Sequence, residues 1–430
     1  MHAEALTERL AQRLVRPVGP DARARARLHL LDWLGCVAGA RHSPVAGVAK
    51  AAEPDRLTRA ALMGNVLETD DVHRAAILHP GPVVWPAALA AARETGACLG
   101  ALLEAGVRGY EAAIAVGLAL DAHHYARFHT TATAGGFGAA AAAASLFGLA
   151  PGAVADALAS WGSIAGGLWR TRHEPASMAK QLHVAHSALA GLWCARLARH
   201  GWRGPRGVLE GEQGLFAATC AAPRLMPLDD AGWLVAGVSF KPWPACRHAH
   251  PAIDAALALP PGALRGGPVE VATYADALRF CDRPDPGTVI EAKFSLQHAI
   301  AVVAVRGRPQ LADFEPDAIA NPQLAQVRAQ VRVAEDPALT ARYPGHYGAR
   351  VRAGGHEAAV ADAWGDPERP MAAPDIADKA RALFAWGKAG GQADAAIALV
   401  LEAPEDAGTG PVLALVEALA GDGLAQREAA

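Results

Sequence analysis

The sequence predicts a mainly α-helical protein, in which a large all-helical domain formed by both chain ends carries a smaller inserted α+β domain. Three observations support this fold class. Apolar residues recur at three- and four-residue spacing from about residue 4 to about residue 235. Proline punctuation and short β-type runs follow, and helical periodicity then returns. We therefore assign residues 1–240 to the helical domain, 241–375 to the inserted domain, and 376–430 to helices that rejoin the first domain.

Helices are expected throughout the first domain. The N-terminal segment has the period of an amphipathic helix, is broken by prolines, and continues into a second helix. Several later segments, such as "GYEAAIAVGLALDAHH", are apolar on almost all sides, which places them inside a multi-helix domain. Asp21 and Pro151 are expected helix starts, and Gly39 and Gly96 are expected helix ends.

Short β-type runs characterise the inserted domain. They lie at 268–275, at 329–336 and at 348–364, and the last one predicts a hairpin that turns at Gly354–Gly355. The segment "SLQHAIAVVAV" between them predicts a helix lying on the sheet. Helices are expected again in "PDIADKARALFAWG" and "GPVLALVEALAGDG".

Length, charge and cysteine usage narrow the class of protein. A chain of 430 residues with 52% hydrophobic residues is expected to form two folded domains. The net charge of −3 argues against nucleic acid or an anionic membrane as the main partner. The 6 cysteines have no zinc, iron–sulfur or thioredoxin spacing, which indicates reduced side chains and a cytoplasmic location. No secretory signal is recognised, and the most apolar stretch, 134–155, is interrupted by Gly and Pro and predicts a buried helix pair.

Five polar clusters interrupt the apolar sequence and contain many of its 17 histidines. Three of them lead directly into an apolar helix, whose N-terminal N–H groups favour anions. With lysine and arginine beside the histidines, the clusters indicate a carboxylate receptor equipped with proton-transfer groups. The clusters are Glu68, Asp70, Asp71, His73 and His79; His123, His124, Arg127, His129, Thr130, Thr131 and Thr133; Lys180, His183 and His186; Lys241, Arg247, His248 and His250; and Lys293, Ser295, Gln297 and His298.

Each cluster also has a purely structural interpretation. Asp70 and Asp71 could cap a helix or lie in a solvated turn, and His129 could simply lie beside a helix end. The sequence contains no dinucleotide fingerprint, phosphate loop, H-E-x-x-H motif or G-x-S-x-G elbow. Asp70 and Asp71 with His73 or His79 could hold a divalent cation, but this spacing is not distinctive. We therefore predict an acid–base enzyme with no metal and no cofactor.

In chain order, these clusters resemble the MmgE/PrpD family, which includes 2-methylcitrate dehydratase, cis-aconitate decarboxylase and iminodisuccinate epimerase. The matching stretches run from about residue 30 to about residue 305 and include "LLDWLGCVAGA", "LETDDVHRAAILHPGPVVWP", "GYEAA", "FHTTATAGGFG", "KQLHVAHSALAG", "KPWPACRHAHPAID" and "EAKFSLQHAI". The resemblance implies a helical domain, an inserted α+β lid, a cleft between them and a homodimer. It also implies a small di- or tricarboxylate substrate and catalysis without a metal or an organic cofactor.

Carried over position by position, the resemblance assigns individual residues. Asp70 belongs to the aspartate-pair motif, His79 to the H-P motif, His129 to "FHTTATAG", Lys180 and His183 to K-x-x-H, and His250 to the segment after P-x-C. Three positions depart from the family pattern: Glu68 replaces a frequent aspartate, Val72 a threonine, and His298 a tyrosine. The K-x-x-H motif also continues through Val184 and Ala185 to His186 in place of glycine and a polar residue.

The implied mechanism begins with removal of a proton alpha to a carboxylate. His129 or His79 is the expected general base, and Asp70 would orient one of these imidazoles. Lys180, with His183 nearby, is expected to stabilise the charge that develops, and His250 to protonate a leaving hydroxyl. The expected substrate-binding residues are Glu68, His183, His186, Lys241, Arg247, Arg127 and His298, whereas Asp71 and His73 are expected to be structural.

These expectations favour a hydro-lyase, a dehydratase acting on a 2-methylcitrate-like acid. An epimerase or a decarboxylase acting on a related acid would need the same proton transfer, so both stay open. A further alternative is a catalytically degenerate protein that binds a carboxylate metabolite without converting it.

Overall fold

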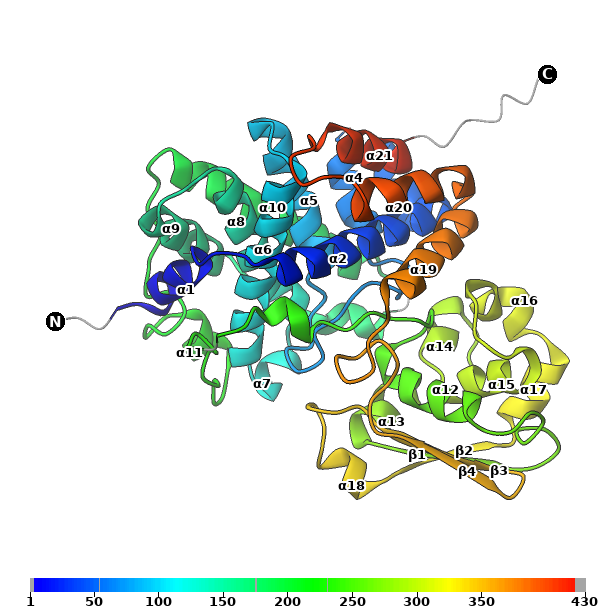
Figure 1. The fold of residues 1–430 in the computed structure, drawn as a ribbon. Helices are drawn as coiled ribbons and strands as arrows, with labels where there is room; N and C mark the ends of the chain where they lie inside the picture. The colour runs from blue at the N-terminus through cyan, green and yellow to red at the C-terminus, as the bar shows by residue number, and fades with distance from the viewer. Residues whose placement is uncertain (1–3, 54, 175, 230, 422–430) are drawn as a thin grey trace. The chain divides into compact units, whose positions relative to one another are not determined.

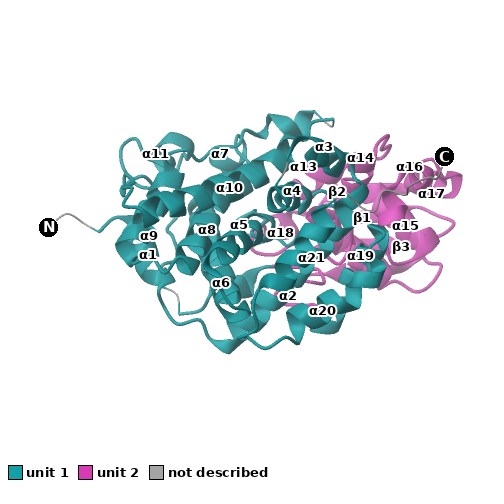
Figure 2. Ribbon diagram, turned by 90° about the horizontal axis from the view of Figure 1, so that it is seen from above, with its two compact units in different colours: residues 1–238, 372–430 teal, residues 239–371 magenta. Residues whose placement is uncertain are grey.

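The computed structural model describes residues 4–53, 55–174, 176–229 and 231–421. The chain divides into two compact units, coloured separately in Figure 2: unit 1 comprises residues 1–238 and 372–430, and unit 2 comprises residues 239–371. Most of the described chain is helical, and the β-structure is a mixed sheet of four strands within unit 2. The predicted fold class, mainly α with a smaller α+β part, is confirmed.

Helix α8 (Thr130–Leu146) lies at the centre of unit 1, where it contacts α5 (Gly81–Thr95), α6 (Leu99–Ala119), α9 (Pro151–Gly162) and α10 (Ala179–Arg199) (Figure 1). Its sequence is almost entirely Ala, Gly and Thr, so its neighbours can approach closely from several sides. A Cβ atom on Gly138 would lie 2.6 Å from the carbonyl oxygen of Gly109 in α6. The predicted buried helix pair in 134–155 is therefore formed by α8 and α9, and no helix among the described residues is long and apolar enough to span a membrane.

Helices from the N-terminal and C-terminal parts of the chain pack together within unit 1. Helix α19 (Ala373–Trp386) packs against α2 (Pro20–Gly39), and α20 (Ala393–Leu401) also contacts α2. Lys379 of α19 donates a hydrogen bond of 2.5 Å to Asp32 of α2 and another of 2.5 Å to the carbonyl oxygen of Thr69. Burial raises the pKa of Asp32 to about 6, although the charge of Lys379 opposes this shift.

The remaining helices of unit 1 complete the layers around α8 and α2. Helix α9 begins at Pro151 and α2 ends at Gly39, as predicted, whereas α2 begins at Pro20, one residue before the expected start. Gly96 follows α5 with φ +67°, the left-handed conformation that ends many helices. The other elements are α1 (Leu6–Leu14), α3 (Pro44–Ala52), α4 (Arg56–Met63), α7 (Ala122–Tyr125), α11 (Leu215–Thr219), α21 (Gly410–Ala420), and the 3₁₀ segments η1 (Ala40–His42), η2 (Trp169–His173), η3 (Leu234–Gly237) and η6 (Gly390–Gln392).

The segment between α10 and η3 departs from the predicted helical pattern. Only the five-residue helix α11 forms in its described part, and turns and irregular chain surround it. Glycines and a proline in "GWRGPRGVLEGEQG" interrupt the apolar spacing, and both residue types disfavour the helix interior. The expectation of nearly continuous helix to residue 235 was therefore wrong for this segment.

The sheet of unit 2 has the strand order β2–β1–β3–β4. β1 (Val269–Thr273) runs parallel to β2 (Val331–Glu335) and antiparallel to β3 (Ala349–Ala353), which pairs with β4 (His356–Val360). Each strand lies within a predicted β-type run. Gly354 and Gly355 both have positive φ, as a two-residue hairpin turn requires, so the predicted turn is confirmed.

Helices of unit 2 gather on one face of this sheet (Figure 1). α12 (His250–Leu257) contacts β3 and β4, and α15 (Leu296–Arg306) contacts β2, as predicted for the apolar segment between the β-type runs. Their apolar faces and the strands share one buried core. The other elements are α13 (Ala275–Cys281), α14 (Val289–Lys293), α16 (Pro316–Ile319), α17 (Pro322–Arg328), α18 (Pro337–Thr340), η4 (Arg247–Ala249) and η5 (Leu311–Phe314).

Candidate active site

The first polar cluster lies in the loop of residues 64–80, which connects α4 and α5. Paired main-chain hydrogen bonds of 2.8 and 3.4 Å between His73 and Leu78 close the loop. Glu68 has φ +58°, a conformation that is unfavourable for a residue with a side chain. Its carboxylate is almost completely buried and forms an ion pair with Lys180 at the start of α10. This contact helps to hold Glu68 in its strained conformation.

His79 lies beside the Asp70 carboxylate in the same loop and is hydrogen-bonded to the main chain of Asp71. The Nδ1 atom of His79 lies 2.9 Å from Oδ2 of Asp70 and 2.8 Å from the carbonyl oxygen of Asp71. Both neighbours are acceptors, so Nδ1 carries the hydrogen and Nε2 carries the lone pair in the neutral ring. Asp70 is buried, while the His79 side chain is 16% exposed. A carboxylate behind an imidazole is an arrangement suited to general acid–base catalysis.

His129 occupies the N-cap position of α8 and is almost completely buried. Its ring stacks on Trp169 with the ring centroids 4.4 Å apart, and its Nδ1 has no hydrogen-bond partner among the described residues. Burial lowers the pKa of His129 well below its ordinary value, and the neighbouring Lys180, His79 and His183 lower it further. His129 is therefore a neutral imidazole at pH 7, with nitrogen atoms able to exchange a proton.

The start of α10 supplies a cation and another imidazole. Lys180 reaches Glu68, and its side chain remains 20% exposed. The His183 ring lies one turn further along α10, with its centroid 5.6 Å from that of His129, and burial lowers the pKa of His183. His186 is exposed and lies edge-on to Trp161, with 6.0 Å between their ring centroids.

Six of the predicted site residues thus lie close together within unit 1, and we call them the proton-transfer cluster: Glu68, Asp70, His79, His129, Lys180 and His183. They come from one loop and from the first turns of α8 and α10. The cluster combines a single ammonium group with three imidazoles and two carboxylates. Chemically, it can bind an anion and transfer protons to or from it.

A second buried network surrounds Asp71, which was expected to be merely structural. Its Oδ2 atom accepts hydrogen bonds from His29 Nδ1 at 2.8 Å and Tyr110 Oη at 2.6 Å, and its Oδ1 accepts one from the main-chain N–H of Gly81 at 3.0 Å. Burial lowers the pKa of His29 to about 4 and raises the pKa of Tyr110 well above its ordinary value, so both donors are neutral. We call these four residues the Asp71 network.

The prediction from sequence missed His29 and Tyr110 as partners of the polar loop. Both residues lie in apolar helices, 42 and 39 positions from Asp71, and nothing in their periodicity marks a polar contact. One signal was present, because "GYEAA", which contains Tyr110, is among the stretches that resemble the family. His73 is also buried, and its Nδ1 accepts a hydrogen bond from the N–H of Ala76 at 3.1 Å within the loop.

Four predicted site residues lie in unit 2, and all of them are buried there: Lys241, Arg247, His250 and His298. Arg247 forms an ion pair with Asp366, and its guanidinium carbon lies 5.8 Å from the centroid of the Tyr347 ring. His250 begins α12, and its Nε2 lies 3.1 Å from the carbonyl oxygen of Ala245. Their predicted roles toward a substrate stay predictions.

His298 and Arg127 have other partners in the structure. The His298 ring is hydrogen-bonded at both nitrogens, with Nε2 2.7 Å from the carbonyl oxygen of Asp313 and Nδ1 3.2 Å from the guanidinium of Arg328. Burial lowers the pKa of His298 to about 4. Arg127 is exposed and donates to the carbonyl oxygen of His123 at 3.1 Å. Substrate binding by either residue also stays a prediction.

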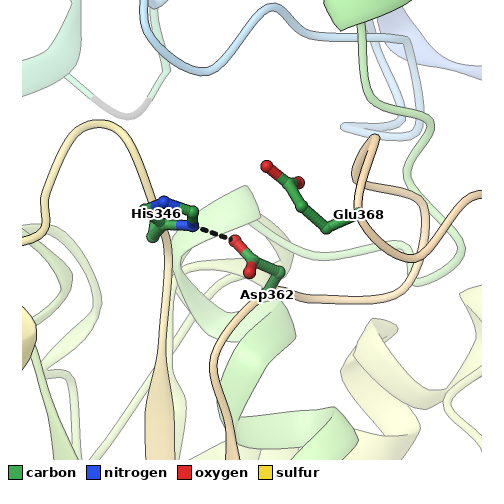
Figure 3. A group of neighbouring side chains, drawn as sticks. All are labelled: His346, Asp362 and Glu368. Carbon is green, nitrogen blue, oxygen red and sulfur yellow. Dashed lines mark hydrogen bonds and ion pairs between the residues drawn. The ribbon is translucent and has the colours of Figure 1, made fainter.

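One group among the described residues has side chains close enough to share a metal ion, and it lies in unit 2: His346, Asp362 and Glu368 (Figure 3). Their potential ligand atoms lie within 4.8 Å of one another, and an imidazole with carboxylates suits several divalent metals. However, His346 Nδ1 and Asp362 Oδ1 are 2.7 Å apart and already hydrogen-bonded to each other. None of these three residues was predicted for the site.

Two domain models of one protein family match the chain. Residues 57–227 match the MmgE/PrpD N-terminal domain, and residues 243–403 match the MmgE/PrpD C-terminal domain. The chain belongs to the MmgE/PrpD family. The N-terminal match contains the whole proton-transfer cluster of this MmgE/PrpD protein, and the two matches together contain every predicted site residue except Lys241.

Curated relatives of this MmgE/PrpD protein include cis-aconitate decarboxylases. The human enzyme is 28% identical over 223 residues, which are 49% of this chain and 46% of the relative. The mouse enzyme is likewise 28% identical over 223 residues, 49% of this chain and 45% of the relative. A cis-aconitate decarboxylase-like protein oryM of Aspergillus oryzae is 32% identical over 225 residues, 46% of each chain. The match therefore covers less than half the length of each relative.

Proposed function

We propose that this MmgE/PrpD protein is a lyase that transfers protons at a carbon next to a carboxylate of a small di- or tricarboxylic acid. The proton-transfer cluster is the observation that supports this proposal. It sets a neutral buried imidazole, a carboxylate-bound imidazole and an ammonium group together within one unit. Each of these groups answers one requirement of the chemistry.

The first requirement is a base with a lone pair that can accept a proton. His79 donates its Nδ1–H to the Asp71 carbonyl, which leaves the lone pair on Nε2. After His79 takes a proton, the Asp70 carboxylate stabilises the imidazolium that results. His129 is a second imidazole of the cluster, which burial keeps neutral, and it can likewise accept a proton.

The second requirement is stabilisation of negative charge. A carbanion next to a carboxylate spreads its charge onto the carboxylate oxygens, and fixed cations or N–H donors lower its energy. Lys180 is suited to this role because its ammonium lies beside His129 at the start of α10. In the structure Glu68 supplies the counter-charge of Lys180, and a substrate carboxylate would compete for the same ammonium.

Decarboxylation is the reaction that the curated relatives favour. With a cis-aconitate-like acid, the bond between the methylene carbon and its carboxylate breaks and CO₂ leaves. The electron pair moves through the allylic system, and a proton from a cluster histidine forms a new C–H bond alpha to another carboxylate. Water restores that proton to the histidine, so the reaction consumes one proton and needs no oxidant.

Dehydration of a 2-methylcitrate-like hydroxy acid is the second candidate, favoured in the sequence analysis because a general acid would suit a leaving hydroxyl. A cluster histidine would remove the alpha proton, and the hydroxyl would leave as water after taking a proton from a general acid. Epimerisation would return the proton to the opposite face of the same carbon. All three reactions share the proton transfer but give different products, so one experiment that follows both distinguishes them.

Proton NMR of the purified protein in D₂O tests the proposal with cis-aconitate, 2-methylcitrate, citrate, malate and substituted succinates. We expect loss of CO₂ and one incorporated deuterium from cis-aconitate; loss of water from 2-methylcitrate would instead select dehydration. His129→Ala is expected to lower kcat on the order of a hundred- to ten-thousand-fold. The matched control is His124→Ala, because His124 is also buried but is hydrogen-bonded to Thr219.

Two results would contradict the proposal. Binding of these acids without any deuterium exchange would identify a carboxylate-binding protein that does not convert its ligand. An unchanged kcat in both His129→Ala and His79→Ala would exclude the proton-transfer cluster as the site of the reaction.

A further inference from the structure

We propose that Asp71 is a positioning residue, which holds His79 in the orientation and tautomer that proton abstraction requires. The proposal rests on the proposed function of His79. Asp71 touches no reacting atom in this scheme, and it acts through its own main chain. The argument has three steps, concerning the Asp71 carboxylate, the Asp71 main chain and the chain that follows His79.

The Asp71 carboxylate is fixed by donors from three helices. His29 comes from α2, Tyr110 from α6, and the N–H of Gly81 from the first residue of α5. Tyr110 Oη also accepts a hydrogen bond of 3.1 Å from Trp85 Nε1, which directs the phenolic hydrogen toward Asp71. Three donors on two oxygens suit an acceptor-only carboxylate, and all of these side chains are buried. The position of Asp71 is therefore determined by the core of unit 1.

The main chain of Asp71 transmits this position to His79. Its carbonyl oxygen lies 2.8 Å from His79 Nδ1, and the carboxylate of the adjacent Asp70 lies 2.9 Å from the same atom. The hydrogen bond of His79 Nδ1 goes to the Asp71 carbonyl, so fixing Asp71 fixes this acceptor. A carbonyl oxygen can only accept, so it keeps the hydrogen on Nδ1 and leaves Nε2 free of it. Loss of this arrangement would allow the other tautomer, whose Nε2 cannot accept a proton.

The main chain from His79 to Gly81 is fixed by Thr131 of α8 and by Asp71. The main-chain N–H of His79 donates to Thr131 Oγ1 in the first turn of α8 at 3.0 Å, and Gly81 follows two residues later. A Cβ atom on Gly81 would lie 2.8 Å from Asp71 Oδ1 and 2.9 Å from Tyr110 Oη. The backbone therefore approaches Asp71 more closely than any other residue type would allow at this position.

Kinetics of single variants provide the first test. Asp71→Asn has the same shape but must place an amide N–H against a donor, and we expect kcat to fall on the order of a hundred-fold with KM nearly unchanged. Tyr110→Phe removes one of the three donors to Asp71, together with the acceptor of Trp85 Nε1, and should lower kcat on the order of tenfold while the protein still folds. Glu111→Gln is the matched control, because Glu111 is the next residue of α6 and is equally buried, but it pairs with Arg13 and the N–H of Leu234.

Combination with a His79 variant separates positioning from general destabilisation. If Asp71 acts through His79, then Asp71→Asn should have no further effect on kcat in a His79→Ala background. An additional hundred-fold loss in that background would overturn the proposal. A wild-type kcat in both Asp71→Asn and Tyr110→Phe, together with an inactive His79→Ala, would overturn it as well while leaving the proposed function intact.

A spectroscopic measurement tests the proposal without any substrate. In protein labelled with ¹⁵N-histidine, the signals that disappear in His79→Ala identify this ring, and they should report the Nδ1–H tautomer. In Asp71→Asn the same signals should report a mixture of tautomers. An unchanged tautomer in Asp71→Asn would contradict the positioning role, even if none of the tested acids proves to be a substrate.

Discussion

Glu68 is a residue whose backbone conformation and charge are explained by one partner. Its positive φ costs on the order of 1–3 kcal/mol in a residue with a side chain. The conformation brings its buried carboxylate to Lys180, the cation that we propose to stabilise the negative charge of the reaction. The strained conformation of Glu68 therefore places a negative charge beside the ammonium group of Lys180.

Removing the charge of Glu68 should strengthen substrate binding. In Glu68→Gln the Lys180 ammonium no longer has a competing carboxylate, so we expect KM for a dicarboxylate to fall on the order of tenfold, or about 1.4 kcal/mol. Steady-state kinetics at constant ionic strength measure this effect. Glu174→Gln is the control, because Glu174 forms an exposed ion pair with Arg170. A rise in KM for Glu68→Gln would mean that Glu68 itself holds the substrate.

For single residues, the sequence predicted which side chains belong to the candidate site better than it predicted their hydrogen-bond partners. Asp70, His79, His129 and Lys180 stand out as polar residues in apolar surroundings, and the structure brings them together. The Asp71 network was not predicted, because it depends on contacts between distant helices. Neither periodicity nor charge pattern encodes which buried tyrosine faces which carboxylate.

At the scale of single elements, α8 determines how the site is assembled. Its N-terminus carries His129, and Thr131 of its first turn binds the main chain of His79. The body of the helix lies among four others and is made of small residues, so its position is set by close backbone contact. A shift of this helix would move both imidazoles.

A methyl group on the buried face of α8 should therefore disturb stability and activity together. The Cβ atom of Gly138→Ala would lie 2.6 Å from the Gly109 carbonyl oxygen and 2.9 Å from the Cβ of Ala113, and a backbone atom cannot rotate away. We expect a loss of about 1–3 kcal/mol in the free energy of unfolding, measured by urea denaturation.

Gly47→Ala provides the comparison, because Gly47 lies within helix α3 and a Cβ atom there would meet nothing within 4 Å. That variant should be neutral or more stable by about 0.4–1 kcal/mol. Equal stabilities for Gly138→Ala and Gly47→Ala would contradict the role of close packing around α8.

The elements themselves were predictable where the local signals are strong. The hairpin followed from two glycines between β-type runs, and the helix starts followed from prolines. The irregular chain after α10 was not predicted, because its apolar residues imitate helical spacing although glycines interrupt them. In such a segment the tertiary contacts, which the sequence does not reveal, decide the conformation.

At the scale of the whole molecule, buried histidines link folding to pH. Burial lowers the pKa of His29, His73, His124 and His298 to about 4 in each case. In the unfolded chain these imidazoles take up protons below about pH 6.5, whereas in the folded protein they remain neutral. These histidines therefore leave the free energy of unfolding unchanged above pH 6.5 and lower it as the pH falls from 6.5 toward 4.

The free energy of unfolding should decrease steeply on acidification. Each such histidine contributes a slope of up to about 1.4 kcal/mol per pH unit. Asp32 and Glu111 oppose this trend, since burial raises both pKa values, that of Asp32 to about 6, but the buried histidines outnumber them. Urea denaturation at pH 7.5, 6.5 and 5.5 measures the slope, and His124→Gln should reduce it. Identical urea midpoints at all three pH values would contradict the expectation.

The contact of Lys379 with the Thr69 carbonyl also has a consequence for biosynthesis. The two residues are separated by 310 positions, so the loop that carries Glu68 and Asp70 leaves the ribosome long before α19 is translated. At about 5–20 residues per second, the interval amounts to tens of seconds. During this time the nascent helices of unit 1 expose the surface of α2 that α19 later covers. In a nascent chain of this protein, the face of α2 that α19 covers is therefore still open, and the loop of residues 64–80 still lacks one of its hydrogen-bond donors.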